Sequence, residues 1–130
     1  MSQPSAPSDA ELSILKCFWR DGDLSAREVQ DRIGVEQGWT SSTTRTVLER
    51  MRAKKLLGRR DVHGMAVYST TQPKVAVIGV LMRRLGALLE IDGALPVAAF
   101  SGSQILDAED IAALEAALKT DAPSEPEGQA

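Results

Sequence analysis

Hydroxyl and basic side chains are concentrated in one short segment of the sequence. Five consecutive hydroxyl residues run from Thr40 to Thr44, and Thr46 follows after Arg45. Between Ser41 and Arg60 only Glu49 is acidic, whereas seven residues are basic: Arg45, Arg50, Arg52, Lys54, Lys55, Arg59 and Arg60. Hydroxyl and cationic side chains both donate hydrogen bonds to phosphate oxygens. The segment therefore indicates binding of a polyanion, with a solvated helix face as the plain alternative if charge alone is considered.

The overall charge of the chain conceals this local excess of positive charge. The 130 residues carry a net charge of −3, and the pI is about 5.2. Residues 1–70 contain 11 Lys and Arg against 9 Asp and Glu, whereas residues 71–130 contain 4 against 9. Because a partner responds to the local field, an acidic average does not exclude a nucleic acid as partner.

Other kinds of chemistry find no support in the sequence. The single Cys17 cannot form an internal disulfide or a metal site by itself, and we expect a buried, inert thiol. Paired carboxylates, metal-ligand spacings, Gly-rich phosphate loops and nucleophile motifs are missing, so we expect no enzyme activity, no cofactor and no metal. The sequence also lacks an apolar run of eighteen residues and a secretory signal, which predicts a cytoplasmic protein with no stable membrane association.

Capping patterns indicate the helices that precede the hydroxyl segment. Ser8 with Glu11, and Ser25 with Glu28, form capping boxes, which predict a helix after each serine. Gly34 is expected to end the second helix.

A third helix and a hairpin complete the predicted first domain, residues 8–72. Thr40 can cap a helix that begins at Ser41 and buries one stripe of residues, namely Thr44, Val47, Leu48 and Met51. The segments "LGRRD" and "MAVYSTT" have the composition of strands, and "VHG" joins them as a short turn. Three helices with a two-stranded wing predict a mainly α fold that starts with a winged helix-turn-helix.

This layout gives the hydroxyl and basic residues a common role. The second helix of a helix-turn-helix lies in the major groove, where its N-terminal residues reach base edges. Small hydroxyls allow close approach, Arg45 can bind guanine or phosphate, and the wing arginines flank the backbone. We therefore predict DNA contacts by Thr40, Ser41, Ser42, Thr43, Arg45, Thr46, Arg52, Arg59 and Arg60. Trp39 is expected to pack as a hydrophobic staple and His63 to be a surface turn residue, with a DNA contact as the alternative for each.

The second half of the chain predicts a helical dimerisation domain over residues 73–120. Pro73 suits the first turn of a helix that runs to about Glu90, a short helix is expected near Pro96 to Phe100, and Asp107 can cap the last helix. The apolar surface of the helix from about Lys74 to Glu90 is too wide for a helix that covers one side of a small domain, which favours a dimer interface. The predicted dimerisation residues are Val77, Ile78, Leu81, Met82, Leu85, Leu88, Leu89, Ile111, Leu114 and Leu118. Residues 1–7 and 121–130 are expected to be disordered tails.

Several of these segments together resemble the BlaI/MecI penicillinase-repressor family, which includes the CopY copper repressors. The resemblance rests on "ELSILKCFW", "SAREVQDRI", "TSSTTRTVLERMRAKKLLGRR" and "AVYS". It implies a homodimeric winged-helix repressor that binds a double-stranded operator with dyad symmetry and dimerises through its C-terminal helices. In the penicillinase branch it also implies release by cleavage in the C-terminal domain, which depends on a membrane-bound zinc-protease sensor of β-lactams.

The sequence departs from the family pattern at several positions. The copper branch carries C-terminal Cys-x-Cys motifs, and this chain has only Cys17. The resemblance places the cleaved bond at Ala99-Phe100, where Ala replaces the Asn of the penicillinase branch. Ser42 occupies a position that is often basic, so the base preference is expected to differ.

Two other classes of winged-helix protein remain as alternatives. A ligand-responsive regulator of the MarR type has dimer helices at both ends of the chain, whereas here the first helix starts almost at the N-terminus. A protein–protein interaction module would present an apolar or acidic recognition helix, whereas this helix is hydroxyl-rich and basic.

Overall fold

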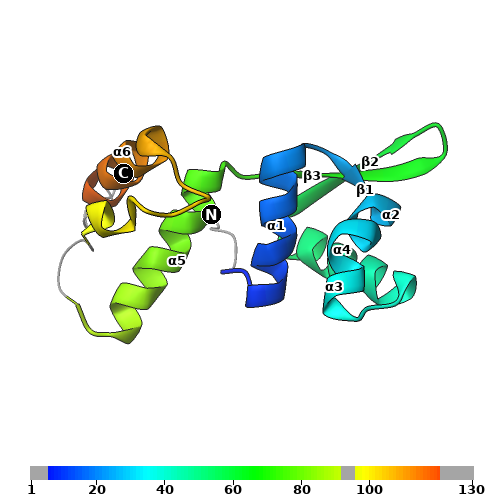
Figure 1. The fold of residues 1–130 in the computed structure, drawn as a ribbon, viewed down its shortest axis with the longest axis horizontal. Helices are drawn as coiled ribbons and strands as arrows, with labels where there is room; N and C mark the ends of the chain where they lie inside the picture. The colour runs from blue at the N-terminus through cyan, green and yellow to red at the C-terminus, as the bar shows by residue number, and fades with distance from the viewer. Residues whose placement is uncertain (1–5, 92–95, 121–130) are drawn as a thin grey trace, which may run out of the picture. The chain divides into compact units, whose positions relative to one another are not determined.

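The computed structural model describes residues 6–91 and 96–120 and divides the chain into two compact units, Met1–Pro73 and Lys74–Ala130 (Figure 1). The expected tails lie largely outside the described residues. The first unit contains, in order, α1 (Asp9–Asp21), β1 (Leu24–Ser25), α2 (Ala26–Val29), a π-helical turn (Gln30–Gly34), α3 (Val35–Gln37), α4 (Ser41–Ala53), β2 (Leu57–Val62) and β3 (Met65–Thr70). The expected mainly α fold with an N-terminal winged helix is confirmed.

Both predicted capping boxes are present. The Ser8 amide donates to Glu11 Oε1 at 2.9 Å, and the Glu11 amide donates to Ser8 Oγ at 3.2 Å. Ser25 and Glu28 repeat the arrangement with distances of 2.8 and 3.2 Å. These reciprocal bonds satisfy amide groups that the first turn of a helix leaves without partners, and so they fix where α1 and α2 begin.

The expectation that Gly34 ends the second helix is wrong. The helical path continues through Gly34 to Gln37 and ends at Gly38, whose φ of 76° is left-handed. Gly34 instead allows close packing, because a Cβ there would lie 2.7 Å from Thr44 Oγ1 on α4. A glycine required by packing and a glycine that stops a helix look the same in sequence.

The wing is part of a three-stranded sheet in the order β1-β3-β2, and the short β1 was not predicted. β1 pairs antiparallel with β3 through Leu24 with Tyr68 and Ser25 with Val67. At the hairpin tip His63 and Gly64 have φ values of 51° and 78°, as a two-residue turn with both central residues at positive φ requires. β1 attaches the base of the wing to the segment between α1 and α2.

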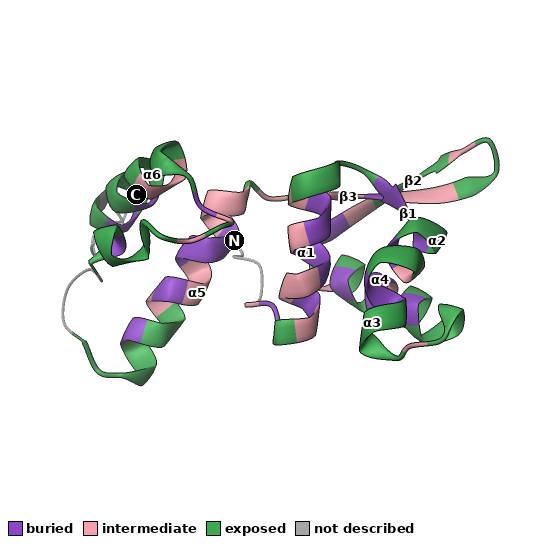
Figure 2. Ribbon diagram, in the orientation of Figure 1, coloured by how far each residue is buried: buried purple, intermediate pink, exposed green. Residues whose placement is uncertain are grey.

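The core of the first unit lies between α1, α2, α4 and the base of the sheet (Figure 2). Its fully buried side chains come from the three helices and from the residue that precedes β2, and they include Ile14, Leu15, Val29, Leu48, Met51 and Leu56. The predicted stripe of α4 is confirmed, since Thr44, Val47, Leu48 and Met51 are all buried. Cys17 is buried as expected, and burial raises the pKa of its thiol.

The second unit contains α5 (Lys74–Leu88), a 3-10 helix (Val97–Phe100) and α6 (Ala108–Thr120). Asp107 caps α6 as expected, because its Oδ1 accepts the Asp110 amide at 2.8 Å. Lys74 Nζ joins the two helices by pairing with Asp110 Oδ2 at 2.8 Å, which lowers the Asp110 pKa. Leu114 is fully buried and packs near Gly79 of α5. In the described part of the chain, no helix is long and apolar enough to cross a membrane.

Candidate nucleic-acid interface

The start of α4 exposes a row of hydroxyl groups. Thr40 is the N-cap, and its Oγ1 accepts the Thr43 amide at 3.1 Å. The Thr46 hydroxyl donates to the Ser42 carbonyl at 3.0 Å. The exposed residues of this row are Thr40, Ser41, Ser42, Thr43, Arg45 and Thr46, all of which were predicted to contact DNA. Their local bonds hold the short side chains close to the helix, so that this end stays narrow.

Thr44 has a different role from its hydroxyl neighbours. Its side chain is buried, and its hydroxyl donates to the Gln30 side-chain carbonyl. Gln30 Nε2 in turn donates to the Trp39 carbonyl at 2.9 Å. Gln30 therefore fixes the turn before α4, together with the first turn of α4 itself. Sequence patterns did not single out Gln30, since a polar residue in the middle of a helix carries no local signal for such a contact.

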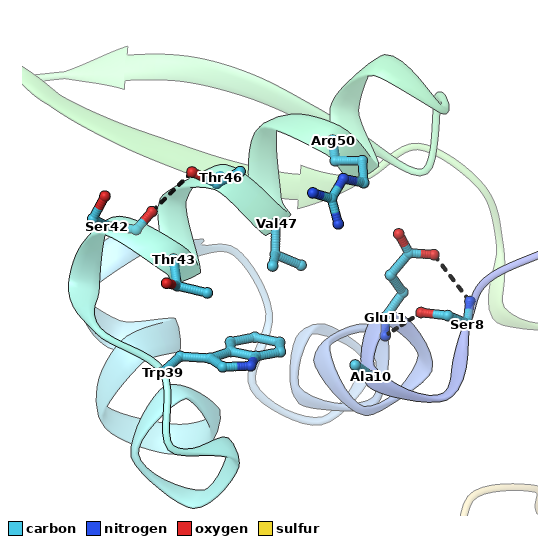
Figure 3. A pocket seen from close by; sticks show the side chains of 9 residues that line it. All are labelled: Ser8, Ala10, Glu11, Trp39, Ser42, Thr43, Thr46, Val47 and Arg50. Carbon is cyan, nitrogen blue, oxygen red and sulfur yellow. Dashed lines mark hydrogen bonds between the residues drawn. The ribbon is translucent and has the colours of Figure 1, made fainter.

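A cavity of about 360 Å³ separates the start of α1 from the side of α4 (Figure 3). Trp39 reaches across it from the turn toward Ala10, below Thr43 and Val47. Trp39 is half-buried there, which favours the packing role that the sequence suggested. Arg50 extends into the same cavity from the next turns of α4.

The arginines of this surface fall into two groups. Within the described residues, Arg45 and Arg50 make no side-chain hydrogen bond or ion pair, and both are exposed. Arg52, Arg59 and Arg60 are instead held in ion pairs. Arg45 therefore projects free from the hydroxyl-rich end of α4, where a ligand could bind its guanidinium without displacing a protein partner.

Glu49 is the centre of the paired group. Its Oε1 accepts from Arg52 at 2.8 Å, and its Oε2 accepts from Arg59 at 3.3 Å and from the Tyr68 hydroxyl at 2.6 Å. The hydrogen bond from Tyr68, followed by those from the arginines, lowers the pKa of Glu49 despite partial burial. Burial and the bond to Glu49 raise the pKa of Tyr68. Neither residue was predicted to belong to the site.

The remaining wing arginine, Arg60 on β2, pairs at 2.7 Å with Asp23, the residue that precedes β1. Arg59 also lies 3.7 Å from Asp61. A smaller cavity of about 190 Å³ lies between α2, α4 and the wing, and its charged lining consists of Arg27, Arg45, Glu49 and Arg59. Arg27 is exposed and was missed by the sequence analysis, because it lies on a different helix from the basic segment.

The predicted dimerisation residues separate into buried and exposed sets. Val77, Ile78, Met82, Leu114 and Leu118 are buried within the single chain, and Leu81 and Ile111 are half-buried. Leu85, Leu88 and Leu89 are 44%, 69% and 60% exposed, and Ile91 and Phe100 nearby in sequence are also exposed. Ala99 and Phe100, the predicted cleavage position, lie in the 3-10 helix and are exposed. His63 is exposed at the tip of the wing.

Comparison with known proteins assigns this arrangement to a family. The family model described as "penicillinase repressor" matches residues 7–120, which covers most of the chain and reaches into both units. No curated protein matches the chain. The match confirms the family suggested by the sequence motifs, and it agrees with a basic, hydroxyl-rich helix beside a wing. The chain therefore belongs to the penicillinase repressor family, whose members are DNA-binding transcriptional repressors rather than enzymes.

Proposed function

We propose that the chain is a cytoplasmic, homodimeric repressor that binds an operator with two-fold symmetry. The N-terminal half of α4 enters the major groove, and the wing follows the adjacent backbone. The observation that carries this proposal is the exposed row of hydroxyls around the unpaired Arg45 at the start of α4. Small side chains allow a close approach there, and Arg45 can bind the N7 and O6 atoms of guanine.

Arg60 remains available to phosphates in this proposal, although it is paired. Arg60 and Asp23 are 57% and 46% exposed in their side chains, and exposed ion pairs of this kind contribute only about 0–1 kcal/mol. A phosphate can therefore replace Asp23 at little cost. Each cation that binds a phosphate releases condensed counterions, so binding is expected to weaken steeply with salt.

The contacts can be tested with three variants measured by fluorescence anisotropy on labelled duplexes. Arg45→Ala should weaken a selected site by about 1–3 kcal/mol and relax the preference at one base pair. Arg60→Ala should weaken binding to all duplexes alike. The slope of log affinity against log salt concentration should become shallower by the amount that corresponds to about one phosphate contact. Arg20→Ala at the end of α1 removes the same charge outside α4 and the wing and serves as the control. Binding that is insensitive to salt in every variant would contradict the proposal.

Dimerisation is proposed through the second unit. The exposed Leu85 and Leu88 at the C-terminal end of α5 and Leu89 directly after it form an apolar surface, and exposed apolar patches of this kind commonly mark interfaces. Leu88→Glu should convert the dimer to a monomer in sedimentation experiments. Val35→Glu is the matched control, because Val35 is apolar and 68% exposed but lies in the first unit. A dimer that tolerates Leu88→Glu would exclude this interface.

For release from DNA we propose cleavage at Ala99-Phe100 after β-lactam exposure, by a membrane-bound zinc-protease sensor. The exposure of both residues supports access by a protease, and a cut there separates α5 from α6 in the chain. Mass spectrometry of protein recovered from cells tests the proposal. Fragments that end at Ala99 and occur only after β-lactam treatment support the proposal. Intact protein that leaves its operator indicates regulation by a ligand instead.

A further inference from the structure

Glu49 has an unusual position for an acidic residue in a surface that binds DNA. It is the only acidic residue between Ser41 and Arg60, and it lies in the middle of α4. A carboxylate near DNA phosphates repels them, and the lowered pKa of Glu49 keeps that carboxylate ionised at neutral pH. Its presence therefore reduces the general attraction of this surface for any duplex.

The contacts of Glu49 suggest what offsets this repulsion. Tyr68 on β3 is only 2% exposed, and its hydroxyl holds Glu49 Oε2 at 2.6 Å, so a buried residue anchors the carboxylate. From this fixed point Glu49 holds Arg52, one turn further along α4, and Arg59 on β2. The bonds to Tyr68 and Arg59 thus join the groove-facing helix to both strands of the wing, whereas the bond to Arg52 stays within α4.

Long arginine side chains lose considerable freedom when they bind in one geometry. An arginine that is already held by an anchored carboxylate has lost much of that freedom before DNA binds. It therefore binds best to a duplex whose phosphates match the position in which it is held. A released arginine, in contrast, can reach phosphates on any sequence. Selectivity and general affinity are therefore expected to change in opposite directions when Glu49 is neutralised.

We propose that Glu49 is a positioning residue that sets the sequence selectivity of DNA binding, by holding Arg52 and Arg59 in one geometry relative to the wing. This role rests on the proposed function. It differs from two simpler roles, because a purely repulsive charge would weaken every duplex equally, and a purely structural bond would affect folding rather than the choice of sequence.

The test uses the full chain and two 30-bp duplexes, one selected by the wild-type protein from a randomised library and one with the same bases shuffled. Glu49→Gln should bind the shuffled duplex about 3- to 10-fold more tightly. Its affinity should also fall more steeply with salt concentration, by an amount that corresponds to up to about one phosphate contact. Its affinity for the selected duplex should stay unchanged or fall, so that the ratio of the two affinities drops by at least about 3-fold.

Two further variants keep the outcome interpretable. Tyr68→Phe keeps the buried ring and removes only the hydroxyl anchor, so it should lower the ratio in the same direction even if Glu49→Gln folds poorly. Glu115→Gln removes the same charge from an exposed position on α6 and should leave the ratio unchanged.

Three results would overturn the proposed role of Glu49. An equal gain in affinity of Glu49→Gln for both duplexes would show that Glu49 acts only as a repulsive charge. An equal loss of affinity for both duplexes, accompanied by a lower melting temperature of the variant, would show that Glu49 acts only through a structural bond. Failure of the wild-type chain to bind either duplex in a salt-dependent way would instead refute the proposed DNA-binding function itself, and the role of Glu49 with it.

Discussion

The ion pair between Glu11 and Lys54 offers a sharp test of how the recognition helix is held in the first unit. Glu11 is 4% exposed, and its Oε1 accepts both the Ser8 amide at 2.9 Å and Lys54 Nζ at 2.7 Å. One carboxylate thus caps the start of α1 and binds the residue that ends α4. Glu11→Gln keeps the size of the side chain but removes its charge.

The chain contains a natural control for this substitution. Glu28 occupies the same position in the second capping box, with nearly the same bond lengths, but it is exposed and has no ion pair in the described structure. Glu28→Gln should cost about 0.5 kcal/mol, the lower end of the range for a helix cap. Glu11→Gln should cost about 2–3 kcal/mol, because it also removes a charge-assisted bond between the buried Glu11 and a half-buried Lys54.

The assay is urea denaturation of the full chain followed by tryptophan fluorescence. Both tryptophans, Trp19 and Trp39, lie in the first unit, so their emission reports the unfolding of that unit. A double-mutant cycle with Lys54→Met isolates the pair. Equal costs for Glu11→Gln and Glu28→Gln would refute the claim that Lys54 binds a buried carboxylate.

The effect of Glu11 should also depend on pH in a defined direction. Burial alone would raise the Glu11 pKa, but the hydrogen bonds from Lys54 and Ser8 outweigh it and lower the pKa below the ordinary 4.5. The folded state therefore binds the proton more weakly than the unfolded state. Stability from Glu11 is present above about pH 5 and is lost as the pH falls through the folded pKa. The difference in stability between wild type and Glu11→Gln should accordingly shrink as the pH falls below the ordinary value of 4.5.

Two further predictions concern packing and assembly. Gly34→Ala should lower the free energy of unfolding of the first unit by about 1–3 kcal/mol. The reason is that the added Cβ would crowd Gln30 and lie 2.7 Å from Thr44 Oγ1. An unchanged midpoint of urea denaturation would contradict this packing. A fragment of residues 1–72 should be monomeric in light scattering and bind DNA weakly, since it lacks α5 and α6. Binding of a selected site as tight as that of the full chain would remove the dimer from the mechanism.

Local patterns in the sequence were sufficient for most elements of the first unit. Both capping boxes, the buried stripe of α4 and the hairpin follow from short-range chemistry, and the structure confirms them. Gly34 was misread because its function depends on Thr44, ten residues away on another helix. The short β1 was missed because its two residues form a strand only by pairing with β3.

The sequence was sufficient to predict which types of residue form the candidate site, but not which of their side chains bind one another. Spacing alone placed the hydroxyls and Arg45 on one exposed end of α4. It could not indicate that Glu49 would hold Arg52 and Arg59, or that Tyr68 would anchor Glu49 from 19 residues away. The same limit applies to the second unit, where the predicted dimerisation residues included both Leu114 and Leu88, although the first is buried and the second is exposed.

Sequence-specific binding of a two-fold operator by α4 and the wing can be tested by sequencing the DNA that the full chain retains from a randomised duplex library. We predict one enriched motif with two-fold symmetry, whose half-sites are separated by about 10 bp or a multiple of it. Arg45→Ala should change the base preference within each half-site without changing the spacing of the half-sites. Retained DNA with no enriched motif, or a motif without symmetry, would show that α4 and the wing do not bind such an operator.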